Sequence, residues 1–120
     1  MTITQAAELE GLREIGRVVA DALQAMSRAL TPGMTTAELD EIGRAFLERE
    51  GAVSAPQSSY GFPGATCISV NEEIAHGIPG PRAIAVGDLV NIDVSASKAG
   101  WFADTGATFQ VGPTAPALAK

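Results

Sequence analysis

Apolar residues recur every three or four positions from Thr4 to Leu30, which is the spacing of one face of an α-helix. The charged residues of this stretch fall mostly off the apolar stripe, and a Thr-Pro-Gly sequence ends the pattern. Thr35 and Glu38 then form a capping-box signature for a second apolar-periodic stretch, which Gly51 ends. The pattern therefore predicts two helices, at about 4–30 and 36–50.

After Gly51 the pattern changes to short apolar runs separated by turns rich in Gly and Pro. Residues 52–56 and 66–70 are expected to be strands, with a polar loop at 57–64 between them. Strict alternation follows at 90–97, where every second residue is apolar, as in a half-buried strand. We expect the sheet to span about 52–111. Two helices followed by an antiparallel sheet predict an α+β fold in which the helices cover one sheet face.

Two aspartates lie on the two predicted arms of one β-hairpin, with the turn near Lys98. A loop of two or four residues centred between Lys98 and Ala99 places Asp93 directly opposite Asp104. Carboxylates about 5 Å apart repel, so this pairing indicates a shared proton or a divalent cation. A three-residue loop, 98–100, would instead place them on opposite faces as ordinary solvated side chains. Spacing alone leaves both arrangements open.

The last residues resemble the start of a helix. Gly112-Pro113-Thr114-Ala115-Pro116 is followed by helix-forming residues up to Lys120. We expect a helix to begin at about 115–120 and the chain to be an incomplete domain. A frayed tail is the alternative interpretation.

Composition narrows the class of protein. The 120 residues are 46% hydrophobic and 18% charged, as in one globular domain, 1–120. The formal net charge is −6 and the eight Lys and Arg are scattered, which argues against direct nucleic-acid binding. We find no signal sequence and no membrane-spanning stretch, and the single Cys67 excludes an internal disulfide. These features predict a cytoplasmic protein.

A series of short motifs closely resembles the type I methionine aminopeptidases of bacteria. The motifs keep their order and spacing along nearly the whole chain: Ser-Ala-Pro at 54–56, Phe-Pro-Gly at 62–64, Thr-Cys-Ile-Ser-Val-Asn-Glu-Glu at 66–73, Ala-His-Gly-Ile-Pro at 75–79, Gly-Asp-Leu-Val-Asn-Ile-Asp-Val-Ser at 87–95 and Ala-Asp-Thr-Gly at 103–106. The resemblance implies the N-terminal half of a pita-bread fold, in which two related halves surround a dimetal site. It implies an enzyme that removes the initiator methionine from nascent proteins with a dimetal-bridging hydroxide as the nucleophile.

The resemblance also implies roles for individual residues. Asp93 would chelate one divalent ion and Asp104 would bridge two, the metals being cobalt, manganese, iron, zinc or nickel. His76 would be a catalytic and substrate-binding residue that hydrogen-bonds the substrate and helps stabilise the tetrahedral intermediate. Cys67 and Phe62 would line the pocket for the methionine side chain. From the residues alone, the better interpretation of His76 is a structural histidine, and that of Cys67 and Phe62 is plain core.

The family's other ligands, one histidine and two glutamates, correspond to positions beyond Lys120, as does a second substrate-contacting histidine. The resemblance therefore implies that this chain needs a C-terminal half and is inactive alone. The expected partners are the N-terminal methionine of nascent peptides and a ribosome-proximal setting, with no membrane. Two other functions compete: a non-catalytic half-domain that associates with itself or a partner, and a relative of aminopeptidase P or prolidase.

Overall fold

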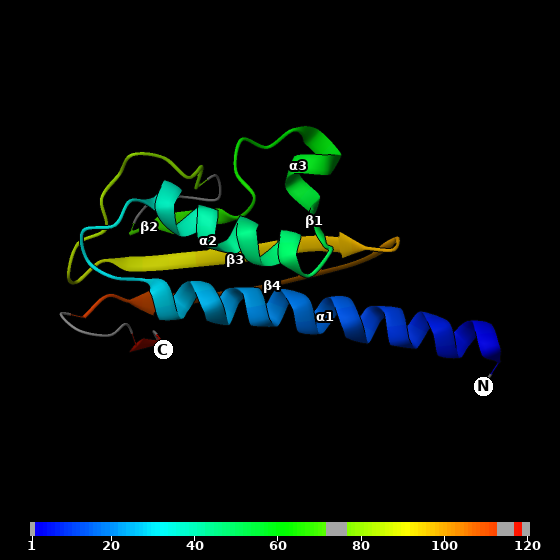
Figure 1. Ribbon diagram of the computed structural model, residues 1–120. Helices are drawn as coiled ribbons and strands as arrows, with labels where there is room; N and C mark the ends of the chain where they lie inside the picture. The colour runs from blue at the N-terminus through cyan, green and yellow to red at the C-terminus, as the bar shows by residue number, and fades with distance from the viewer. Residues whose placement is uncertain (1, 72–76, 113–116, 119–120) are drawn as a thin grey trace.

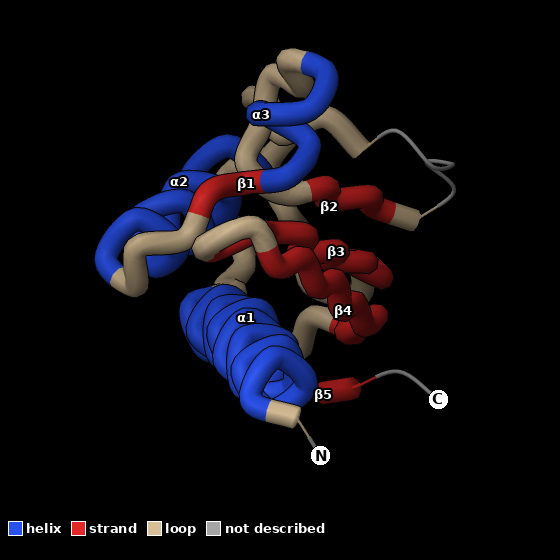
Figure 2. Tube along the Cα trace, turned by 90° about the vertical axis from the view of Figure 1, so that its right-hand side faces the viewer, coloured by secondary structure: helices blue, strands red, loops and turns tan. Residues whose placement is uncertain are grey.

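The computed structural model describes residues 2–71, 77–112 and 117–118. Two helices, α1 (Ile3–Ala29) and α2 (Thr36–Arg49), pack on one face of an antiparallel sheet (Figure 1). The view turned by 90° shows these helices and the strands as two layers (Figure 2). Neither α1 nor α2 crosses to the other sheet face. The predicted α+β arrangement, with two helices covering one face, is what the structure shows.

Each long helix begins with a capping box, and the one on α2 lies where its sequence signature predicts it. The Thr35 hydroxyl accepts from the Glu38 N–H at 3.1 Å, and the Glu38 carboxylate accepts from the Thr35 N–H at 2.9 Å, which completes the predicted capping box. Thr2 and Gln5 form the equivalent box on α1. No helix of the described residues combines the length and apolar composition that a membrane span requires.

The sheet is built around β3 (Leu89–Lys98), which is antiparallel to every strand it pairs with. The short strands β1 (Val53–Ser54) and β2 (Cys67–Val70) share one edge of β3. On its other edge lies β4 (Trp101–Gln110), followed by β5 (Ala117–Leu118). β3 and β4 pair over their full lengths and form the long hairpin that positions both predicted aspartates.

The core lies between the helices and the inner face of the sheet. Alternate β3 residues face the helices and are fully buried, as their period-2 pattern predicts. The apolar stripe of α1 packs against them. The buried members of this core from the two long helices and β3 are Ile15, Val18, Val19, Ala22, Met26, Leu39, Leu47, Val90, Ile92, Val94 and Ala96.

Two segments differ from the sequence prediction. Residues 55–60 form a short helix, α3 (Ala55–Tyr60), where we expected the end of a strand and a loop. Ser54 caps it and Pro56 lies in its first turn, so the local residues favour a helix start. Ala117–Leu118 form β5 instead of the predicted helix, because they pair with Phe109 and Gln110 of β4. The remaining residues of that predicted helix, 115–116 and 119–120, lie outside the described ranges.

The hairpin turn differs from both predicted loops. Lys98 pairs with Trp101, so the turn consists of Ala99 and Gly100, with φ values of 53° and 86°. Two successive positive φ values are typical of the type I′ turn, whose twist matches that of paired strands. Asp93 consequently pairs with Gly106, and Ser95 pairs with Asp104. The aspartates share a face as diagonal neighbours; the prediction that they are directly opposed is wrong, and so is the alternative of opposite faces.

Two glycines of α1 provide a matched pair of substitutions. A Cβ on Gly11 would lie 2.3 Å from the Trp101 indole, whereas a Cβ on Gly16 would meet nothing within 4 Å. We expect Gly16→Ala to stabilise the fold by about 1 kcal/mol through helix propensity. We expect Gly11→Ala to destabilise it, since overpacking costs about 1–3 kcal/mol and outweighs the same propensity gain. Urea unfolding of both variants measures the difference; similar midpoints would contradict the docking of Trp101 on α1.

Candidate metal centre and substrate pocket

Asp93 and Asp104 lie on the sheet face that α1 and α2 leave uncovered. Both side chains are exposed, and they line one open depression of about 330 Å³ together with Ser95 and Gly106. Diagonal neighbours on adjacent strands have Cα atoms about 7–8 Å apart, with the Cβ atoms somewhat closer. This spacing removes the direct clash that exact opposition would cause, while a ligand between the strands could still contact both carboxylates.

A row of three residues crosses the sheet at the candidate site. Cys67 of β2 pairs with Asp93 of β3, which pairs in turn with Gly106 of β4. A Cβ on Gly106 would lie 2.0 Å from the Asp93 Oδ1 atom. The Asp93 carboxylate therefore lies over the backbone of β4, in space that only a glycine leaves free. The row places Cys67, predicted to be a pocket residue, beside a predicted metal ligand.

The surroundings of Asp93 and Cys67 raise the pKa values of both side chains. Partial burial, and then the charge of Asp104, raise the pKa of Asp93 above its ordinary value. Burial, and then the charge of Asp93, raise the pKa of Cys67, while a hydrogen bond from the Gly77 backbone opposes the shift. Cys67 is thus a neutral thiol at pH 7, which suits contact with an apolar group better than metal ligation. A divalent cation beside Asp93 would offset the repulsion between the carboxylates.

The other two predicted site residues are placed less directly. Phe62 follows α3 and is half-buried, and its backbone N–H donates to the Pro56 carbonyl at 3.2 Å. The chain continues from Phe62 through residues 63–66 to Cys67, the first residue of β2. His76 lies outside the described residues, so its role stays a prediction.

Asp93 and Asp104 fit part of a metal site. Carboxylate oxygens are the ligands that hard divalent cations prefer. Within the described ranges, no group of three or more His, Cys, Asp or Glu side chains lies close enough to hold a metal ion. The two aspartates therefore supply a share of a ligand set, and further donors are needed for a closed coordination sphere.

Sequence reasoning missed one buried polar residue that contacts the segment leading into Cys67. Asp40 of α2 is only 8% exposed, and its carboxylate accepts hydrogen bonds from the segment that precedes Cys67. The signal for it was readable, because Asp40 falls among the core-facing positions of α2 with Thr36, Gly43 and Leu47. A carboxylate at a core-facing helical position has to find buried donors.

The sequence profile of metallopeptidase family M24 matches residues 10–120. The chain belongs to this family. Methionine aminopeptidase 2 of Bacillus subtilis is 55% identical to it over 113 residues, which are 93% of this chain and 45% of that protein. The crystal structure of methionine aminopeptidase from Rickettsia prowazekii superposes with a TM-score of 0.84 at 33% identity, over 89% of this chain and 43% of that one. This M24 chain thus spans less than half the length of these relatives.

These similarities confirm the family and the fold that the motifs predicted. The chain corresponds to the N-terminal half of a pita-bread metallopeptidase. The Xaa-Pro dipeptidase of Bacillus anthracis has a TM-score of 0.74 at 22% identity, covering 88% of this chain and 28% of that one. At that identity the likeness shows a shared fold alone.

The raised pKa of Asp93 predicts a stability change with a definite sign. The folded chain binds the Asp93 proton more tightly than the unfolded chain, so without metal the fold loses stability as pH rises from the unfolded-state pKa through the folded-state pKa. Above both values the cost is constant. We expect Asp93→Asn, in chelator at pH 7, to unfold at a higher urea concentration than the parent chain. The difference should vanish near pH 3, below the ordinary Asp pKa of about 3.9; equal midpoints at pH 7 would contradict it.

Proposed function

We propose that this chain is the N-terminal part of a metal-dependent methionine aminopeptidase that removes the initiator methionine from nascent proteins in the cytoplasm. The placement of Asp93 and Asp104 on one open sheet face is the observation that carries the proposal. The 55% identity to a methionine aminopeptidase of Bacillus subtilis favours this member of the M24 family over the Xaa-Pro enzymes.

In this proposal Asp93 and Asp104 hold two divalent metal ions together with ligands from a C-terminal half. Such ions, when bound, polarise a scissile carbonyl and lower the pKa of water. The glycine at position 106 leaves space for the Asp93 carboxylate to face the ions.

The substrate's methionine side chain would lie against Cys67 and Phe62. Because the Cys67 thiol is neutral at pH 7, it offers a soft, polarisable surface to a thioether without competing as a nucleophile. His76 would donate a hydrogen bond to the substrate amide and to the developing oxyanion. Cys67 and the two carboxylates lie on the same face of the sheet. A substrate with its N-terminus at the metals would need its methionine pocket on that face.

Peptide hydrolysis tests the proposal. We expect the 120-residue chain alone to release no methionine from Met-Ala-Ser with added cobalt or manganese, because two carboxylates do not complete a metal site. Turnover above a metal-only blank, abolished by Asp104→Ala, would contradict that expectation. If the gene continues in frame beyond the Lys120 codon, the longer protein should cleave Met-Ala-Ser and leave Xaa-Pro peptides intact. Preference for Xaa-Pro peptides would overturn the proposed function.

A further inference from the structure

Asp40 directs its buried carboxylate at two consecutive residues of one loop. Its oxygens accept from the Ala65 N–H at 3.1 Å, from the Thr66 N–H at 2.7 Å and from the Thr66 hydroxyl. Thr66 is fully buried as well. A buried carboxylate is costly unless its oxygens are hydrogen-bonded, and hydrogen bonds to a charged group are stronger than neutral ones. Asp40 therefore fixes the backbone of Ala65 and Thr66 relative to α2.

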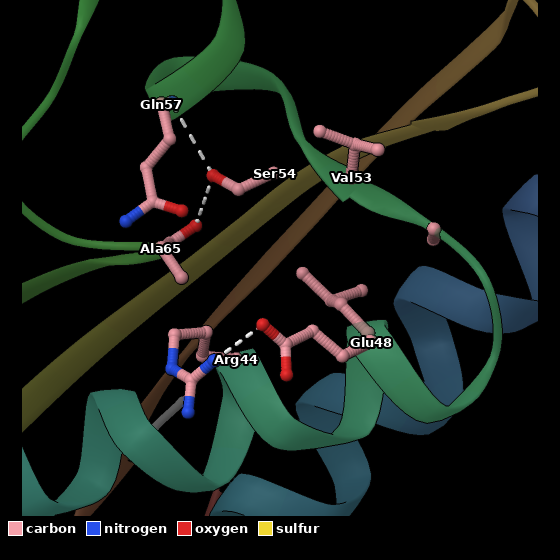
Figure 3. Close-up of a pocket in the computed structure, with 8 residues that line it drawn as sticks. Arg44, Glu48, Val53, Ser54, Gln57 and Ala65 are labelled. Carbon is pink, nitrogen blue, oxygen red and sulfur yellow. Dashed lines mark hydrogen bonds and ion pairs between the residues drawn. The ribbon is translucent and has the colours of Figure 1, made fainter.

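Ser54 anchors the same loop from the opposite side. Its hydroxyl donates to the Ala65 carbonyl at 2.8 Å and accepts from the Gln57 N–H at 3.4 Å. Figure 3 shows the Ser54 oxygen between the two groups, with Ala65 on one side and Gln57 of α3 on the other. Both polar groups of Ala65 are thus held by buried side chains, one from α2 and one from the start of α3.

The packing of α2 against Thr66 is unusually close. A Cβ on Gly43 would lie 2.6 Å from the Met26 Sδ atom and 3.1 Å from the Thr66 methyl group. Glycine at this position lets α2 approach the loop, and Gly43 lies three residues after Asp40 on the same helical face. The approach of the helix and the length of the Asp40 side chain together define where Thr66 lies.

The anchored loop connects the two predicted pocket residues. Phe62 lies three residues before Ala65, and Cys67 immediately follows Thr66 and pairs with Asp93. A shift of Ala65 and Thr66 would move Cys67 relative to the carboxylate beside it and would change the path back to Phe62. We propose that Asp40 is a positioning residue for the substrate pocket, because it holds Ala65 and Thr66, and through them Cys67, in place beside Asp93. The pocket's role rests on the proposed function; the positioning itself does not.

The single cysteine of the chain makes this inference testable without catalysis. The rate of Cys67 alkylation and the backbone amide signals of Phe62 and Cys67 are measured in the 120-residue chain and its variants. In Asp40→Asn we expect alkylation to be about tenfold faster, since loss of buried charge-assisted hydrogen bonds opens the loop locally. Both amide signals should shift.

Matched variants separate positioning from general stability. Thr66→Val, which removes one donor, should change alkylation in the same direction, whereas Thr66→Ser keeps the hydroxyl and should restore the parent behaviour. Asp88→Asn is the control, because Asp88 also anchors a loop, accepting from the Ala85 N–H at 2.9 Å and from the Asn71 amide at 3.0 Å. It should leave Cys67 unchanged. If Asp40→Asn fails to fold, Thr66→Val decides.

Unchanged alkylation and amide signals in both Asp40→Asn and Thr66→Val would overturn the positioning role. Equal acceleration in Asp88→Asn would overturn it too, since the effect would then be general loosening. In a longer, active protein, Asp40→Asn should raise KM for a methionyl peptide about tenfold and change kcat much less, because a displaced pocket wall weakens substrate binding. Absence of any methionine release would reject the proposed function while the alkylation result stands on its own.

Discussion

Replacing Asp104 by asparagine is expected to lower the affinity for divalent cations by more than about 100-fold in a protein that carries the complete site. Substitutions of residues that only orient a metal ligand already cost about 10–100-fold, and Asp104 would be a ligand itself. The loss follows from charge, because Asp104 would contribute one of the carboxylates that attract a cation to this face.

The measurement is a manganese titration followed by paramagnetic broadening of amide signals near Gly106. Asp21→Asn is the matched control, since Asp21 is an exposed aspartate of α1 and its loss changes the net charge equally. The control should bind manganese as the parent chain does. Equal broadening near Gly106 at equal manganese concentrations in Asp104→Asn and the parent would show that the cation binds there without Asp104, which would contradict the prediction.

Gly106→Ala is expected to weaken cation binding without removing a ligand. Its new methyl group would lie 2.0 Å from the Asp93 Oδ1 atom, so the carboxylate has to turn away. We expect a loss of about 10–100-fold in cation affinity, as for other changes that misorient a ligand. The fold should lose little, because the displaced atom is the end of a side chain and alanine is favoured over glycine in a strand by about 0.5–1 kcal/mol.

The two effects are separable by experiment. Manganese affinity and the urea midpoint are measured on the same Gly106→Ala protein, with Gly16→Ala as the control for adding a methyl group where nothing contacts it. A parent-like affinity in Gly106→Ala would mean that Asp93 does not face the cation. A large loss of stability would mean that the strands, rather than the carboxylate, absorb the clash.

Local patterns predicted the helices and the faces of the long strands. Thr35 with Glu38 fixed the start of α2, and the alternation around Val94 showed which side of β3 is buried. These features depend on residues close in sequence, where periodicity and capping act. Asp93 and Asp104 were accordingly assigned to one face in one of the two predicted registers.

The exact register could not be obtained in the same way. It depends on Ala99 adopting a positive φ, which residues other than Gly, Asn and Asp seldom do. α3 was missed because a six-residue helix has too few turns for a periodic pattern, although Ser54 and Pro56 marked its start. Asp40 was missed because its partners, Ala65 and Thr66, lie 25 and 26 residues away in sequence. Long-range hydrogen bonds leave no local pattern.

The two-residue turn at Ala99 and Gly100 sets which face of the sheet Asp104 lies on, so inserting an odd or an even number of residues there has different consequences. β3 and β4 pair without a break from Lys98 and Trp101 to Leu89 and Gln110, so a slide of register at the turn shifts the whole of β4. If the turn itself keeps two residues, an insertion of one residue slides the register by one and turns Asp104 toward the helices, whereas an insertion of two keeps it on the open face. Related proteins that retain both aspartates should therefore vary this turn by even numbers of residues.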